Sequence, residues 1–131
     1  MMLRTKSVWS PKKKTDGLRV LVTRFRGRGL PAARYHVWMA SLGPSERILR
    51  MEQRGSMSWG AFSRAYRAEL FMDGPIDSRS KTIKNHGQKF SLRLLKHLAR
   101  VGNVTLLCHC ADDQKQCHRH ILRRVILSGR V

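Results

Sequence analysis

Two short apolar runs constrain the fold of this chain more than any other feature. Leu18–Thr23 and Val104–His109 are almost continuously apolar or β-branched and are too short for buried helices. Strands covered on both faces have this character, which is typical of a parallel sheet. With helical segments between them, they predict an α/β fold: a small parallel or mixed β-sheet covered by helices. At 131 residues, we expect one domain over residues 1–131.

The remaining elements follow from periodicity and capping signals. Thr5–Trp9 reads as a further short strand. Ser45 and Ser58 are candidate N-caps for two of the helices, and in the third we expect Phe90, Leu94, Leu95 and Leu98 to face the core. The predicted helices cover about residues 46–54, 58–73, 88–100 and 116–127, the second ending at Asp73-Gly74-Pro75.

The charge balance points to an anionic partner. The chain has 27 Lys and Arg against 8 Asp and Glu, a formal net charge of +19. Each phosphate that Lys or Arg neutralises releases counterions, so such a surface binds polyanions without reading bases. A nucleic acid or a phosphate-containing small molecule is therefore the expected partner, although a basic, merely solvated surface is the simpler alternative.

The cysteines and the chain's polarity indicate the compartment. All three cysteines, Cys108, Cys110 and Cys117, lie close together, which is a poor arrangement for a secreted disulfide scaffold. No stretch approaches the roughly 20 apolar residues of a membrane span, and the first residues lack a signal-peptide core. We expect a soluble cytoplasmic protein with reduced thiols and no membrane partner.

Two loops carry the candidate site. The first, Arg24–Pro31, follows a predicted strand and offers anion-binding groups. The second, Cys108–His120, follows the other apolar strand and begins a helix whose N–H groups favour an anion. Ligands bind outside the carboxyl ends of strands in open α/β sheets, so both loops should border one cleft. The candidate anion-binding residues are Arg24, Arg26, Arg28, Gly29 and Arg119.

Three interpretations of the second loop remain open. In the enzymatic one, Cys110 or Cys117 is a thiolate nucleophile, His118 carries a proton, and Arg119 grips the anion. In the metal one, zinc binds Cys110, Cys117, His118 and His120, although the spacing is not a standard one; otherwise no cofactor is expected. In the structural one, Cys108 fills the core, Cys117 and His118 cap or pack the last helix, and Arg119 is a surface or structural residue. Outside the metal interpretation, where Cys108 is a further candidate ligand, burial should keep Cys108 inert.

Several short segments, in this order, resemble the domain of unknown function 488 (DUF488) family over nearly the whole chain. They are Asp16-Gly17, Arg19–Val22, Arg24-Phe25, Arg28–Leu30, Leu42–Ser45, Trp59-x-x-Phe62-x-x-x-Tyr66-x-x-Glu69-Leu70, Val104–Cys108 and Cys117-His118-Arg119. The resemblance implies a compact α/β domain and no particular substrate. Where the family usually has an aromatic residue and a proline, this chain has Arg26 and Gly27, so its loop is more basic.

The sequence therefore predicts a phosphate-binding cleft that takes a nucleotide-like or nucleic-acid ligand. Whether the protein is an enzyme is left open. The alternatives are a non-enzymatic nucleic-acid-binding module and a domain with a structural zinc site.

Overall fold

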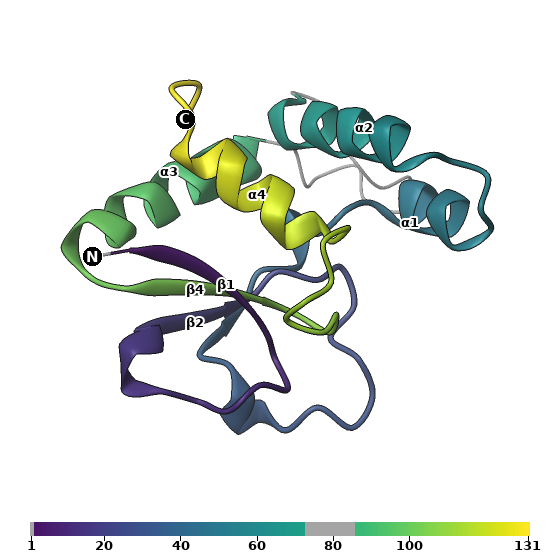
Figure 1. Cartoon of the computed structure of the whole chain (residues 1–131). Helices are drawn as coiled ribbons and strands as arrows, with labels where there is room; N and C mark the ends of the chain where they lie inside the picture. Colours follow the sequence, from purple (N-terminus) through teal and green to yellow (C-terminus); the bar gives the residue numbers. More distant parts are fainter. Residues whose placement is uncertain (1, 73–85) are drawn as a thin grey trace.

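A four-stranded, wholly parallel sheet forms the centre of the molecule (Figure 1). The computed structural model describes residues 2–72 and 86–131. The strand order is β1-β4-β2-β3, and the strands are β1 (Leu3–Ser7), β2 (Leu18–Leu21), β3 (Val37–Trp38) and β4 (Val104–Cys108). The predicted α/β class is confirmed, and the sheet is parallel rather than mixed.

The register brings the ends of the central strands together. Leu18 of β2 and Leu3 of β1 both lie opposite Val104, while Ser7 lies opposite Cys108. Because all strands run the same way, the segments that follow them leave at one edge of the sheet. The loop after β2 and the loop after β4 therefore begin side by side, as the sequence predicts.

The helices cover one face of the sheet and its carboxyl edge. They are α1 (Glu46–Gln53), α2 (Trp59–Phe71), α3 (His86–Val101) and α4 (His118–Leu127). In Figure 1, α3 and α4 lie over one face, and the loops around residues 8–17 and 22–36 cover the other. None of the described helices is both long and apolar enough to span a bilayer.

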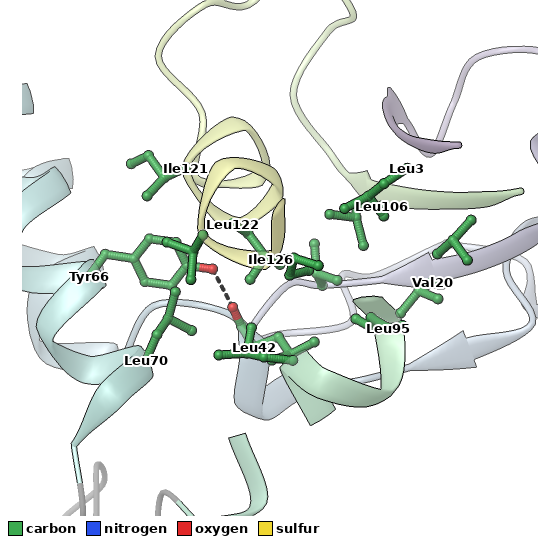
Figure 2. Close-up of a cluster of buried hydrophobic side chains, with 14 of the residues drawn as sticks. Leu3, Val20, Leu42, Tyr66, Leu70, Leu95, Leu106, Ile121, Leu122 and Ile126 are labelled. Carbon is green, nitrogen blue, oxygen red and sulfur yellow. Dashed lines mark hydrogen bonds between the residues drawn. The ribbon is translucent and has the colours of Figure 1, made fainter. Parts of the chain in front are cut away.

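Alternation along the strands divides the core between the two faces. Val20 and Leu106 pack with residues of α2, α3 and α4 in the main cluster, part of which Figure 2 shows. Leu21 and Leu107 point to the other face and pack with Val8 and Leu30 in a smaller cluster. This two-sided burial explains why the strand sequences are apolar at nearly every position.

Polar contacts connect the helical layer to the loops at the carboxyl edge. The buried hydroxyl of Tyr66 donates to the carbonyl of Leu42, the dashed line in Figure 2. The carboxylate of Glu69 accepts from the backbone N–H of Ser45 at 3.0 Å. Both bonds join α2 to the segment before α1, and they fix the position of the helices that border the cavity described below.

The predicted elements are present with four local differences. The first strand is Leu3–Ser7 and not Thr5–Trp9, since pairing with β4 sets its register. The two-residue β3 carries no pattern long enough to predict. The last helix begins at His118, with Cys117 at its N-cap position. Ser58 caps α2 by accepting from the Ala61 N–H at 3.1 Å, but Ser45 makes no side-chain cap bond.

The buried face of α3 also differs from the prediction. Leu92 and Leu95 are buried, whereas Phe90 is 64% exposed and Leu94 52% exposed. Leu95 is buried as predicted and Leu98 packs against the core, but periodicity alone did not show that Leu92, rather than Phe90 and Leu94, completes the inner face. The predicted end of the second helix at Asp73-Gly74-Pro75 lies outside the described residues.

Two leucines of α4 test this arrangement. Leu122 is fully buried in the main cluster, while Leu127 is 50% exposed. Leu122→Ala should lower the free energy of unfolding by about 2–5 kcal/mol through lost burial and a residual cavity, and Leu127→Ala by about 0.5 kcal/mol or less. Urea denaturation of both variants measures this, and equal effects would contradict the placement of α4.

Candidate active site

A cavity of about 360 Å³ lies where β2 and β4 end. Thr23, Arg24 and Phe25, which follow β2, form one part of its wall, and the loop after β4 forms another. Helices α1 and α2 close the remaining side with Leu49, Glu52, Gln53, Trp59 and Phe62. The predicted cleft between the two loops thus has a counterpart, although its wall includes helices that sequence reasoning assigned only to the core.

Three cysteine sulfurs meet at the base of this cavity. The Sγ atoms of Cys108, Cys110 and Cys117 all lie within 4.8 Å of one another, and those of Cys108 and Cys117 are 3.0 Å apart. Cys108 ends β4, Cys117 precedes α4, and Cys110 lies in the intervening loop. Cys108 and Cys117 are buried, and Cys110 is partly exposed. Cys108 is therefore buried, as expected, but it belongs to the cluster.

Arg119 holds the loop that carries Cys110. Its side chain is fully buried. Nη1 donates to Cys108 Sγ at 2.8 Å and to the Cys110 carbonyl at 3.0 Å, and Nη2 donates to the Ala111 carbonyl at 2.7 Å. The predicted grip on a ligand phosphate is not what this geometry provides, because the guanidinium is directed at protein groups and does not border the cavity.

Asp112 fastens the same loop to β1. Its carboxylate accepts from the Ser7 backbone N–H at 2.6 Å and from the Ser10 hydroxyl. The Ser10 hydroxyl bond and the Ser7 backbone bond lower the pKa of Asp112. Sequence analysis gave this residue no role, since an Asp in a polar loop carries no local signal of a partner more than a hundred positions away.

The cluster concentrates negative charge on Cys110. Side-chain hydrogen bonds from Cys108 and Cys117, with help from the Arg119 cation, lower the pKa of Cys110 to about 2. The same bonds, together with burial, raise the pKa of Cys108 and of Cys117. Ionisation of Cys110 is therefore favoured over ionisation of its two buried neighbours, whose sulfurs are hydrogen-bonded to each other.

His118 borders the cavity as a neutral imidazole. Burial lowers its pKa to about 4. The Nε2–H donates to the Val22 carbonyl at 2.7 Å, which assigns the hydrogen to Nε2 and leaves Nδ1 as an acceptor. The Tyr66 ring packs edge-on against it, with ring centroids 5.8 Å apart. Nδ1 of His118 is thus an acceptor, its lowered pKa makes it a weak base, and the role of proton carrier stays a prediction.

The basic loop after β2 contributes one arginine to the cavity. Arg24 borders the cavity while its guanidinium donates to the carbonyls of Gly43 and Pro44. Arg26 donates to the Tyr35 hydroxyl at 2.6 Å and to the Leu30 carbonyl, outside the cavity. Arg28 and Gly29 are exposed, and neither borders the cavity. The five candidate anion-binding residues are thus not gathered around one ligand position.

The three cysteine sulfurs lie close enough together to bind one metal ion, and no histidine belongs to this group among the described residues. Cys108, Cys110 and Cys117 are near enough to share an ion, whereas His118 and His120 are not part of this group among the described residues. His120 is 3.4 Å from the Thr5 hydroxyl through Nδ1 and 2.9 Å from the Gln114 carbonyl through Nε2. The set Cys110, Cys117, His118 and His120 proposed from sequence is not assembled; three cysteines are.

The fold and this site define a small parallel α/β domain with a cysteine cluster at the carboxyl edge of its sheet. The chain belongs to the DUF488 family: residues 3–130 match the family model described as "Active DUF488-N3 subclade". No curated protein and no solved structure matches it.

The three thiols should react in a fixed order. Iodoacetamide should label Cys110 first, at a rate nearly constant from pH 9 to pH 5, because its low pKa keeps it ionised throughout. An ordinary cysteine, with a pKa of about 8.5, loses roughly tenfold in rate per pH unit below that value. Peptide mass mapping identifies the labelled residue.

Cys110→Ser is the matched control, since it should leave the native protein almost unlabelled. Earlier labelling of Cys108 or Cys117, or a Cys110 rate that falls tenfold per unit below pH 8, would contradict the assignment.

Proposed function

We propose that this protein is an enzyme in which the Cys110 thiolate attacks a nucleotide-like ligand bound in the cavity. The observation that carries the proposal is the position of Cys110, a partly exposed residue at the cavity wall whose sulfur lies within 4.8 Å of two buried cysteine sulfurs. A nucleophilic cysteine needs a lowered pKa and access to the ligand. Cys117 is buried and its raised pKa keeps it protonated, so it is not the nucleophile.

The cavity wall supports the ligand class. Its volume of about 360 Å³ is within the usual range for small-molecule sites, roughly 300–1,000 Å³. Trp59 and Phe25 offer flat aromatic surfaces for a base-like ring. Glu52, Gln53, Gln114 and Gln116 offer hydrogen-bonding groups, and Arg24 offers positive charge. One ring, several polar groups and a negative charge are what a nucleotide presents.

The reaction follows from the charges of the cluster. The Cys110 sulfur supplies the electron pair for a new bond to an electrophilic atom of the ligand. The leaving group departs with its bonding pair and takes a proton from the solvent. Water or another acceptor, losing its proton to Nδ1 of His118, then displaces the sulfur and restores the thiolate.

Zinc binding is a second candidate function, favoured by the three sulfurs within 4.8 Å. The donor set fits, because thiolate sulfur is a preferred zinc ligand. Cys108, Cys110 and Cys117 would hold the ion, which would supply structural stability or a Lewis acid. A fourth ligand would have to come from solvent or a substrate.

Binding to nucleic acid is also a proposal, and it rests on the net charge of +19. Such binding should weaken steeply with added salt. Retention on heparin at low salt, and its loss at high salt, is the first measurement. The cytoplasmic location inferred from the reduced, clustered cysteines remains part of this proposal.

A nucleoside that carries an electrophile, such as a fluorosulfonylbenzoyl nucleoside, tests the enzymatic proposal. It should modify Cys110 and do so more slowly when free nucleotide competes. Trp59→Ala should slow this modification about tenfold, because an aromatic stacking surface contributes roughly 1–3 kcal/mol per base. Intact-protein mass spectrometry gives both rates.

Two controls separate ligand binding from thiol reactivity. Iodoacetamide labelling of Cys110 should be unchanged in Trp59→Ala, which shows that the cluster is intact. Cys110→Ser should form no adduct. If neither competing nucleotide nor the Trp59 substitution changes the rate of Cys110 modification, the proposal of a nucleotide-like ligand is wrong.

Metal analysis distinguishes the two candidate functions. For the thiolate enzyme we expect less than one zinc per ten chains and Cys110 labelling that a chelator does not change. Stoichiometric zinc that a chelator removes, with labelling rising as it leaves, would favour the metal site instead.

A further inference from the structure

A second cavity, of about 390 Å³, lies at the opposite edge of the sheet from the cysteines. Its wall is formed by residues just before and at the start of β2 and by the residue before β3. Because the strands are parallel, these amino ends and the cysteine-bearing carboxyl ends face opposite ways. The residues that border this cavity are Lys12, Lys13, Lys14, Gly17, Arg19 and His36.

Arg19 carries an unsatisfied hydrogen-bond donor there. Its side chain is 2% exposed. Nη1 donates to the Asp16 carboxylate at 2.5 Å, and Nε donates to the Arg34 carbonyl at 2.8 Å. Nη2, in contrast, is buried and has no hydrogen-bond partner in the part of the chain that the structure describes. A buried guanidinium nitrogen without an acceptor is costly, and a bound anion would supply the acceptor.

His36 presents a second donor, fixed by the backbone. The Arg19 backbone N–H donates to Nδ1 of His36 at 2.9 Å. In the neutral ring the hydrogen is therefore on Nε2, which is a donor. The side chain is exposed and borders the cavity. The His36 ring thus offers its Nε2–H group to a ligand. The hydrogen bond from the Arg19 backbone orients the ring before any ligand binds.

The charges around this cavity favour an anion. Three consecutive lysines border it, and of these Lys12 is tied to the Ala33 carbonyl through one Nζ–H at 2.8 Å, with further donors remaining. The nearby acid, Asp16, is already engaged by Lys6 Nζ at 3.0 Å and by Arg19. Its charge is compensated within the protein, so the lysines and Arg19 leave positive potential over the cavity.

We propose that this cavity binds a phosphate group, at a site separate from the Cys110 cavity. Arg19 Nη2 and His36 Nε2 are the directional donors, and Lys12, Lys13 and Lys14 supply the charge. The phosphate belongs either to a phosphodiester chain or to a free phosphorylated compound; both present the same tetrahedral oxyanion. The proposal does not depend on the thiolate chemistry.

Binding of two probes, pyrophosphate and a short single-stranded oligonucleotide, tests this site. The charge variant Lys12→Gln/Lys13→Gln/Lys14→Gln should weaken both roughly tenfold, as expected for three exposed charge contacts. For the oligonucleotide, the slope of log K against log salt should become shallower by about 2, since each single-strand phosphate contact contributes about 0.7. Calorimetry and fluorescence anisotropy give the affinities.

His36→Asn tests the directional donor without removing the backbone contact. The Asn side-chain oxygen can accept from the Arg19 N–H as Nδ1 does, while the Nε2–H is lost. We expect pyrophosphate binding to weaken several-fold with the thermal midpoint nearly unchanged. If the variant lost affinity because it unfolds, its thermal midpoint would fall as well.

Arg47→Gln/Arg54→Gln/Arg67→Gln is the matched control, since it removes three exposed charges elsewhere. It should retain pyrophosphate affinity. If only the oligonucleotide binds, and the Lys12–Lys14 substitutions weaken that binding, the natural ligand is a phosphodiester chain. If only pyrophosphate binds, the natural ligand is a free phosphorylated compound.

Two results would overturn the proposal: no binding of either probe, or an equal loss in the control variant. Iodoacetamide labelling of Cys110 should be normal in every variant, so failure here is distinguishable from failure of the thiolate proposal.

Discussion

The contact between buried Arg119 and the loop after β4 is the interaction on which the candidate active site depends. One guanidinium binds the Cys108 sulfur and the carbonyls of Cys110 and Ala111. These bonds curl the loop back over the end of the strand, so that Cys110 comes close to Cys108 and to Cys117 at the start of α4. A buried cation must be compensated, and here the carbonyl dipoles and the Cys108 sulfur do so at Nη1 and Nη2, while Nε has no hydrogen-bond partner among the described residues.

The parallel sheet places the cysteine cavity and the lysine-lined cavity at opposite edges. Every strand ends at the edge where the cysteines, His118 and the aromatic cavity wall lie, and every strand begins at the other edge, where the lysines and Arg19 lie. If β2 and β4 were antiparallel, the loops that follow them would leave at opposite edges. The strand order with β4 between β1 and β2 also allows Asp112, after β4, to reach Ser7 at the end of β1.

Local patterns predicted the two central strands and the cap of α2, because these features are encoded locally, whereas the bounds of β1 and the presence of β3 depend on pairing with distant strands. The apolar run before Cys108 and the Ser58 cap need no distant partner to be recognised. The roles of Arg119 and Phe90 could not be predicted in the same way. An arginine next to a histidine at a helix start reads as exposed, and only the sulfur and carbonyls brought there by the loop make its burial favourable. Phe90 is exposed because the sheet meets the Leu92 and Leu95 side of α3 instead.

The charge of the cysteine cluster bears on the choice between thiolate and zinc chemistry. The geometry stabilises one negative charge, on Cys110, and raises the pKa of the two buried thiols. Zinc binding through all three sulfurs would require two further protons to leave, and the ion would lie close to the Arg119 cation, which is 2.8 Å from the Cys108 sulfur and would repel it. Metal affinity would then fall steeply with decreasing pH. Attack by Cys110, as we propose it, needs no such deprotonation, and this charge distribution is our reason for proposing a nucleophile rather than a metal ligand.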